Sequence, residues 1–202
     1  MLQNNFVVTI AREYGSGGRL IGQHLAELMN IDFYDKNIIA MTAEKSGLSE
    51  DFLSSHEQRK KRFGFLPNVI INSKSLPLSD QVYLAQSMVI REAAEKGSCV
   101  IVGRCADYIL RDNPRCVKVF IHAPLQEKIK RIREEYQDDA ADPAAFAAKI
   151  DKERAAHYNY MTLNKWDDVH NYDLVINSSV GIDEAARLIK FFIEEFLKKK
   201  NF

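Results

Sequence analysis

Short runs of apolar, largely β-branched residues recur along the chain, separated by longer stretches with helical spacing. The apolar runs cover residues 6–11, 31–34, 99–103, 116–123 and 172–178. They are apolar throughout and do not alternate with polar positions, which is typical of parallel strands buried on both faces of a sheet. The pattern therefore predicts an α/β protein in which helices cover both faces of a parallel sheet, giving three layers.

The stretches between these runs predict helices at 18–29, 36–46, 49–61, 79–96, 104–111, 124–137, 143–162 and 182–199. Three helix starts carry chemical signals, namely Ser79, Asp142 followed by a proline, and Asp183 after a glycine. Residues 62–78 contain two prolines and a glycine and predict a loop. We expect this loop and the break at 137–145 to be mobile, because neither has helical or strand periodicity.

Composition narrows the class of protein further. The 202 residues suit one domain spanning 1–202, and 28 basic residues balance 28 acidic ones. A chain without net charge has no overall field to attract a polyanion, so we expect no nucleic acid partner. Three cysteines without a C-x-x-C pair predict reduced thiols. The N-terminus lacks a signal-peptide pattern and no apolar run is long enough to span a membrane, so we expect a cytoplasmic protein without a membrane partner.

The stretch "VVTIAREYGSGGRLIG", residues 7–22, places a glycine-rich turn between a predicted strand and a predicted helix. Such a turn points backbone N–H groups and the positive end of the helix dipole at a bound anion. The turn consists of Gly15, Ser16, Gly17 and Gly18, and Arg12 and Arg19 lie beside it. A phosphate-binding P-loop would place lysine and a hydroxyl residue where this chain has Gly18 and Arg19.

Two other interpretations of this stretch stay open. A dinucleotide-binding fingerprint requires G-x-G-x-x-G, but position 20 is leucine and the next glycine is Gly22, although Asp32 or Asp35 could bind a ribose. A tight turn without a ligand is the other interpretation, and it leaves the concentration of glycine beside two arginines unexplained.

Further segments occur in an order that matches a known family over nearly the whole chain. They are "VVTIAREYGSGG", "DFYDKNII", "VIVGRCADYIL", "KVFIHAPLQEKIKRI", "IDKERAAHYNY" and "YDLVINSS". This order resembles the cytidylate kinase-like family, a branch of the nucleoside monophosphate kinases. The chain departs from the family pattern at four places: Gly18 replaces the loop lysine, Arg19 the hydroxyl residue, Lys36 an acceptor-side threonine, and Cys105 the aspartate of G-R-D.

The resemblance implies a P-loop kinase fold with a five-stranded parallel sheet, an acceptor-binding insertion near 35–80 and a lid near 131–155. It implies ATP with Mg²⁺ as the phosphoryl donor and a small nucleotide as the acceptor, with a pyrimidine monophosphate as the leading choice. Two alternatives remain: a nucleotide-binding regulator that has lost turnover, and a kinase of a small molecule that is not a nucleotide. The sequence leaves the oligomeric state open, and its five scattered histidines show no metal-ligand spacing.

Phosphoryl transfer requires positioning of donor and acceptor and neutralisation of the developing charge, so arginines are the residues to look for. We expect catalytic roles for Arg19, Arg104, Arg131 and Asp35. Donor phosphates would contact Arg12 and the segment Gly15, Ser16, Gly17, Gly18 and Arg19, with Arg12 as the alternative to Arg19 for the missing lysine. The acceptor would contact Asp35, Arg104, Asp151 and Arg154, and we expect no metal site formed by the protein alone.

Each of these residues also has a structural interpretation. Arg104 could form a buried salt bridge, Arg131 and Arg154 could be exposed helix charges, and Asp35 could cap the helix at 36–46. Asp151 and Arg154 are three positions apart and therefore share a helix face, where they could form a simple ion pair. Aromatic residues in the same region could stack on a base or pack in the core; they are Tyr158, Tyr160 and Trp166.

Overall fold

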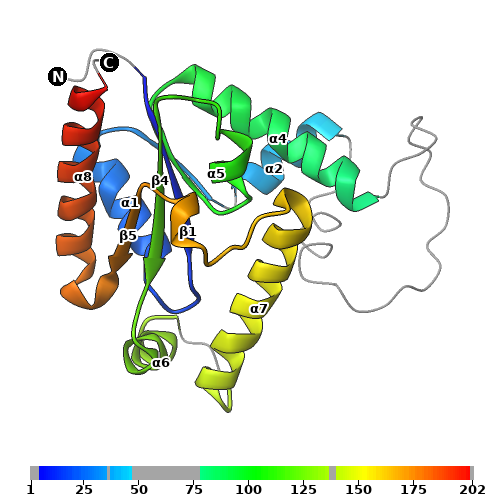
Figure 1. Ribbon diagram of the computed structural model, residues 1–202. Coiled ribbons are helices and arrows are strands. Elements are labelled where there is room, and N and C mark those ends of the chain that lie inside the picture. Colours follow the sequence, from blue (N-terminus) through cyan, green and yellow to red (C-terminus); the bar gives the residue numbers. More distant parts are fainter. Residues whose placement is uncertain (1–4, 36, 47–77, 137–139, 201–202) are drawn as a thin grey trace.

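A parallel sheet of five strands forms the centre of the molecule (Figure 1). The computed structural model describes residues 5–35, 37–46, 78–136 and 140–200. The strands are β1 (Val7–Arg12), β2 (Asp32–Tyr34), β3 (Cys99–Val102), β4 (Cys116–His122) and β5 (Leu174–Asn177). Every apolar run of the sequence contributes one strand, and all neighbouring strands are parallel, as predicted.

Helices cover both faces of this sheet, so the predicted three-layer arrangement is confirmed (Figure 1). On one face lie α1 (Gly18–Met29) and α8 (Ile182–Lys199), and their buried residues include Ile21, Leu25 and Ile189. The core of the other face includes Ile38, Ile90 and Ile109, which belong to α2 (Asn37–Ser46), α4 (Leu78–Lys96) and α5 (Ala106–Ile109).

The order of the strands is β2-β3-β1-β4-β5, with β1 in the middle between β3 and β4. The helix that follows β1 packs on one face of the sheet and the helix that follows β3 packs on the other. Neighbouring strands whose connections leave to opposite faces open a crevice at their carboxyl ends, which is where α/β proteins bind ligands. This crevice lies between Arg12, the last residue of β1, and Gly103, the first residue after β3.

Two further helices, α6 (Leu125–Glu134) and α7 (Pro143–Thr162), lie beyond the carboxyl end of β4 (Figure 1). The Asp142 side chain accepts hydrogen bonds from the N–H groups of Ala144 and Ala145, both at 3.0 Å, and so caps α7 as predicted. Short 3-10 turns at Val169–Asn171 and Ser178–Val180 lie on either side of β5 in the sequence, and the second of them leads into α8.

The other two start signals do not mark an N-cap, although the predicted helix at 182–199 has the bounds of α8. Ser79 lies inside α4, because the helix already begins at Leu78. Gly181 is the residue that precedes α8, and Asp183 lies in the first helical turn. There its negative charge interacts favourably with the positive end of the helix dipole, but its side chain does not cap the helix. The predicted helix at 49–61 and nearly all of the predicted loop at 62–78 lie outside the described residues.

The predicted helix at 104–111 is shorter than expected, because the chain after β3 adopts a left-handed turn. Gly103, Arg104 and Cys105 have φ angles of 77°, 60° and 54°, and α5 begins only at Ala106. Left-handed backbone is favourable for glycine but strained for arginine and cysteine. Strain of this kind tends to accumulate at functional sites, and here it lies at the crevice.

Candidate active site at the carboxyl ends of β1 and β3

The glycine-rich turn connects β1 to α1 and has the geometry of an anion site. Gly15 and Gly17 adopt φ angles of 77° and 75°, and Gly17 precedes the first helical residue. No side chain caps the start of α1, and its first turn contains no acidic residue. The positive end of the helix dipole therefore faces the crevice, and no carboxylate in the first helical turn neutralises it.

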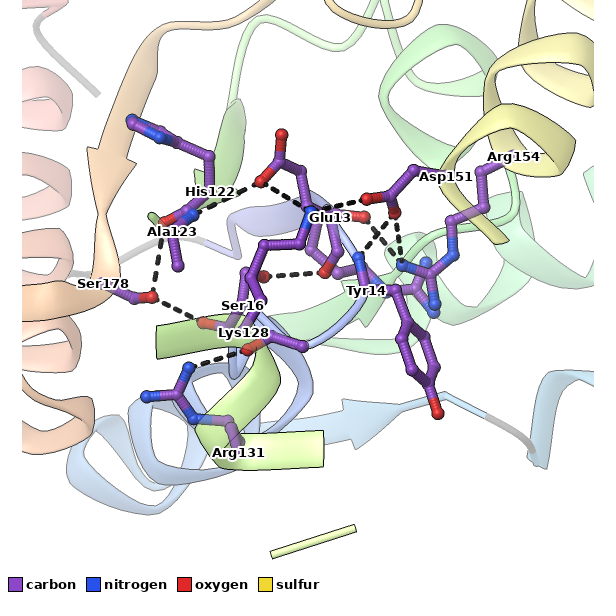
Figure 2. Close-up of polar contacts among 12 residues, drawn as sticks. Glu13, Tyr14, Ser16, His122, Ala123, Lys128, Arg131, Asp151, Arg154 and Ser178 are labelled. Carbon is purple, nitrogen blue, oxygen red and sulfur yellow. Dashed lines mark hydrogen bonds and ion pairs between the residues drawn. The ribbon is translucent and has the colours of Figure 1, made fainter. Parts of the chain in front are cut away.

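Helix α6 lies directly against this turn. A Cβ atom at Gly15 would lie 3.0 Å from both Cβ and the carbonyl oxygen of Lys128, so only glycine fits there. Arg131, which is buried, donates from Nη1 to the Gly15 carbonyl oxygen at 2.7 Å (Figure 2). Its Nε has no hydrogen-bond acceptor, although the Glu135 carboxylate lies 3.5 Å away. Arg131 is therefore not an exposed helix charge but lies against the glycine-rich turn.

A buried ion network fixes the beginning of the turn (Figure 2). The Lys128 ammonium lies 2.7 Å from the Asp151 carboxylate and 3.3 Å from that of Glu13. Asp151 also accepts the backbone N–H of Tyr14 at 2.6 Å. Burial raises the pKa of Asp151, while the hydrogen bonds from Lys128 and Tyr14 lower it. The Asp151 carboxylate is therefore held by the loop and by α6.

Arg154 shares a face of α7 with Asp151, as their spacing predicted, and lies 3.7 Å from it. Its Nη1 donates to the carbonyl oxygen of Arg12 at 2.9 Å, and its guanidinium lies 5.4 Å from the centroid of the Tyr14 ring. Burial lowers the pKa of Arg154, and the charge of Asp151 raises it. Arg154 is thus not an exposed helix charge but lies at the carboxyl end of β1.

A small cavity of about 70 Å³ lies at the crevice, lined by three arginines that come from different parts of the chain. Arg12 ends β1, Arg104 follows β3 and Arg154 comes from α7, and the wall is completed by His157 and Trp166, among others. Burial lowers the pKa of Arg104 to about 10, and neighbouring Asp35 raises it. Burial and the charge of Arg154 lower the pKa of Arg12 to about 9. Crowded guanidinium groups of this kind are stabilised by an anion.

Asp35 and Arg19 form an ion pair at the edge of this arrangement. Arg19 Nε donates to the Asp35 carboxylate at 2.6 Å, and the two side chains are 50% and 8% exposed. Helix α2 begins at Asn37, and the N–H of Asp35 donates to the Asn37 side chain at 2.7 Å. The buried carboxylate of Asp35 is therefore directed at Arg19.

The three aromatic residues considered for base stacking differ in their surroundings. Tyr158 and Trp166 are buried, and the Tyr158 hydroxyl donates to the Asp107 carboxylate at 2.6 Å. Trp166 packs edge-on against Phe120 with 5.3 Å between ring centroids. Tyr160 is 58% exposed. Core packing therefore accounts for Tyr158 and Trp166, as the alternative interpretation proposed.

Sequence reasoning missed three residues of this site, namely Glu13, Lys128 and Tyr136. Glu13 and Lys128 belong to the ion network, and Tyr136 packs edge-on against Tyr14 with ring centroids 5.7 Å apart. The mixed charges at 127–136 have the composition of a solvated helix face, so composition alone does not reveal which of them are buried. The spacing of Lys128 and Arg131, three positions apart, could have indicated that both face the same surface.

The described residues contain no group of three or more histidine, cysteine, aspartate or glutamate side chains able to hold a metal ion. All three cysteines are free, as predicted, and all three are buried. Among the described helices, none is both long enough and apolar enough to cross a membrane.

Comparison with known proteins identifies relatives of the chain. It is 26% identical over 200 residues to the cytidylate kinase of Staphylothermus marinus, covering 96% of this chain and 99% of that protein. An uncharacterized protein from Eubacterium ventriosum has a similar structure, with a TM-score of 0.69, 30% identity and coverage of 94% and 99%. Shikimate kinase from Acinetobacter baumannii shares the fold, with a TM-score of 0.56, 15% identity and coverage of 95% and 94%. The model of the cytidylate kinase-like family matches residues 7–180, and the chain belongs to that family.

Proposed function

We propose that this protein transfers a phosphoryl group from ATP to a small nucleotide, with a pyrimidine nucleoside monophosphate as the leading acceptor. The observation that carries the proposal is that an uncapped helix start and an arginine-lined cavity lie beside each other, and each suits an anion. The glycine-rich turn suits the donor phosphates, and the cavity lined by Arg12, Arg104 and Arg154 suits the phosphate of an acceptor. Relatives named as cytidylate kinases support the choice of acceptor.

In this proposal the residues fall into two groups. Donor phosphates contact the turn from Gly15 to Arg19 together with Arg131, which reaches the turn from the lid near 131–155. The acceptor contacts Arg104, Arg154 and Asp35, and Asp35 begins the acceptor-binding insertion near 35–80. Asp151 acts by holding the Tyr14 amide, and so positions the turn for the donor. Guanidinium groups fixed in place before the reaction lower its barrier by stabilising charge that develops on the transferred oxygens.

Mg²⁺ fits this site as an ion carried by the nucleotide. The part of the chain that the structure describes offers no cluster of three ligands, and Asp35 is a carboxylate that could reach the ion through water. When bound, Mg²⁺ would neutralise charge on the phosphates of the nucleotide. The protein's own contribution is the turn and the arginines.

A coupled assay of ADP release across a panel of nucleoside monophosphates tests the proposal. We expect turnover to be highest with CMP or UMP. Arg104→Met should reduce kcat/KM about ten- to a hundredfold, since it removes a charge-assisted contact. Arg111→Met is the matched control, because Arg111 lies outside the cavity with a side chain that is 46% exposed. Equal loss in both variants would contradict a role for the cavity.

Two other functions are distinguished when the panel also includes small molecules that are not nucleotides. Gly18 and Arg19 replace the lysine and hydroxyl of a P-loop, and this favours a nucleotide-binding regulator, which would bind ATP but turn over no acceptor. Lys36 and Cys105 depart from the family on the acceptor side, and this favours a kinase of another small molecule. Such a kinase would release ADP with a small molecule that is not a nucleotide and not with a nucleoside monophosphate.

A further inference from the structure

Arg12 takes an unusual course between the two anion sites. Its side chain leaves the end of β1, passes over the first residue of α1 and ends against the turn after β3. A Cβ atom at Gly18 would lie 2.6 Å from Arg12 Cβ and 3.0 Å from Cγ. A Cβ atom at Gly103 would overlap Arg12 Nη1 and lie 3.1 Å from Cζ. Two glycines therefore form the groove in which the Arg12 side chain lies.

This course gives a reason for the absence of the P-loop lysine. Gly18 occupies the position at which a P-loop carries its lysine. Any side chain at Gly18 meets the stem of Arg12, because contacts as short as 2.6 Å do not occur between carbon atoms that are not bonded. A lysine at position 18 and an arginine at position 12 thus exclude each other in this backbone.

The charges around Arg12 favour an anionic ligand. Within the described residues, no carboxylate lies in ion-pairing distance of its guanidinium, whereas Arg154 and Arg104 line the same cavity. The lowered pKa of Arg12, caused first by burial and then by Arg154, reflects the cost of holding this charge, which Asp35 and Tyr136 offset in part. A phosphate in the cavity would reduce that cost.

We infer that Arg12 replaces the P-loop lysine and contacts the phosphoryl group that passes between the glycine-rich turn and the arginine-lined cavity. The inference rests on the proposed function. Arg19, the other candidate from the sequence, donates instead to Asp35. The guanidinium of Arg12 ends at Gly103, between the start of α1 and the strained turn that carries Arg104. Arg12 therefore reaches from the donor side to the acceptor side, as a group that contacts the transferred phosphoryl must.

Exchanging the two positions tests this inference. Arg12→Met should lower kcat about ten- to a hundredfold, and Arg12→Lys should recover only part of that loss, because lysine lacks the planar fork. Gly18→Lys alone should be inactive, because its side chain collides with Arg12. The double variant Arg12→Gly with Gly18→Lys removes both the Cβ and the Cγ atom that a side chain at position 18 would meet, and should be more active than either Gly18→Lys or Arg12→Met. Arg19→Ala changes the other candidate for the role of the lysine and should retain more activity than Arg12→Met.

Binding and stability measurements separate this role from others. In calorimetry, Arg12→Met should bind inorganic pyrophosphate at least about tenfold more weakly than wild type does. The midpoint of its unfolding in urea should equal that of wild type or be higher. A lower urea midpoint with unchanged pyrophosphate affinity would assign Arg12 a structural role and overturn the inference. The inference would also be overturned if the double variant were no more active than the more active of the two single variants. If wild type turned over no acceptor, the proposed function would fail, and the pyrophosphate affinities would still decide the role of Arg12.

Discussion

Lys128 is the residue that connects α6 to the glycine-rich turn. It is 8% exposed, and its ammonium lies between the carboxylates of Asp151 and Glu13. Charges removed from water are stable only when they have partners, and here one cation serves two carboxylates. The same carboxylate of Asp151 holds the amide of Tyr14, so the network links the stability of the fold to the shape of the turn.

Removal of the Lys128 charge should therefore be costly. Lys128→Met removes the cation from Glu13 and leaves Asp151 with Arg154 at 3.7 Å, so we expect the free energy of unfolding to fall by about 3 kcal/mol, the low end of the range for a broken buried pair. Urea denaturation of the full chain measures this change. The control is Lys130→Met on the same helix, where the exposed side chain should change stability by no more than about 0.5 kcal/mol. Similar midpoints for the two variants would show that the network contributes little.

Residue-scale features of this site differ in how far the sequence could predict them. The pair Asp151 and Arg154 is local, because three positions on a helix place two side chains on one face. The contact between Lys128 and Glu13 joins residues 115 positions apart. No periodicity within α6 encodes such a contact, since it depends on where β4 ends relative to β1. Charge runs alone therefore cannot separate solvated lysines from buried ones.

At the scale of elements, helix starts depend on which side chain reaches the free N–H groups. Asp142 does so from the N-cap position of α7, helped by Pro143, which needs no partner for its nitrogen. Asp183 lies one position inside the first turn of α8, after Ile182, and has no such contact. Both aspartates belong to helix-start signals in the sequence, but Asp142 occupies the N-cap position of its helix whereas Gly181 occupies that of α8.

These two aspartates give a matched test of capping. Asp142→Ala should lower the free energy of unfolding by about 1 kcal/mol, because two amides at the start of α7 lose their acceptor. Asp183→Ala should cost only about 0.3 kcal/mol, the size of an exposed interaction with the helix dipole. Thermal and urea unfolding of both variants check this order. A larger loss in Asp183→Ala would mean that its contact with His24, at 3.4 Å, contributes more than its exposure suggests.

At the scale of the whole molecule, the layers were predictable because every strand is a continuous apolar run. The order of the strands was not, since five parallel strands can be arranged in several ways. That order brings the end of β1 beside the end of β3, and so brings Arg12 beside Arg104. The left-handed turn at Gly103, Arg104 and Cys105 was also beyond the sequence pattern, because only glycine signals such a backbone. The site thus depends on topology more than on any one motif.

The three buried thiols give a prediction about the whole fold. Cys99 and Cys116 begin β3 and β4, and Cys105 precedes α5. Burial raises the pKa of each thiol to about 12 from an ordinary value of 9. Between these values the unfolded chain loses its thiol protons and the folded chain keeps them. The stability that these thiols contribute is therefore complete below pH 9 and is lost as the pH rises toward 12.

Each thiol should lower the free energy of unfolding by up to about 1.4 kcal/mol per pH unit in this range. Arg12 and Arg104 act in the opposite direction, because their lowered pKa values make the folded chain release protons first. The decisive quantity is therefore the difference in slope between wild type and a variant with all three cysteines replaced by alanine. Urea unfolding from pH 8 to pH 10.5 measures it, and we expect wild type to lose stability faster above pH 9. If the free energies of unfolding of wild type and variant changed in parallel with pH, the thiols would ionise as readily in the folded chain as in the unfolded one. Water would then reach the first residues of β3 and β4.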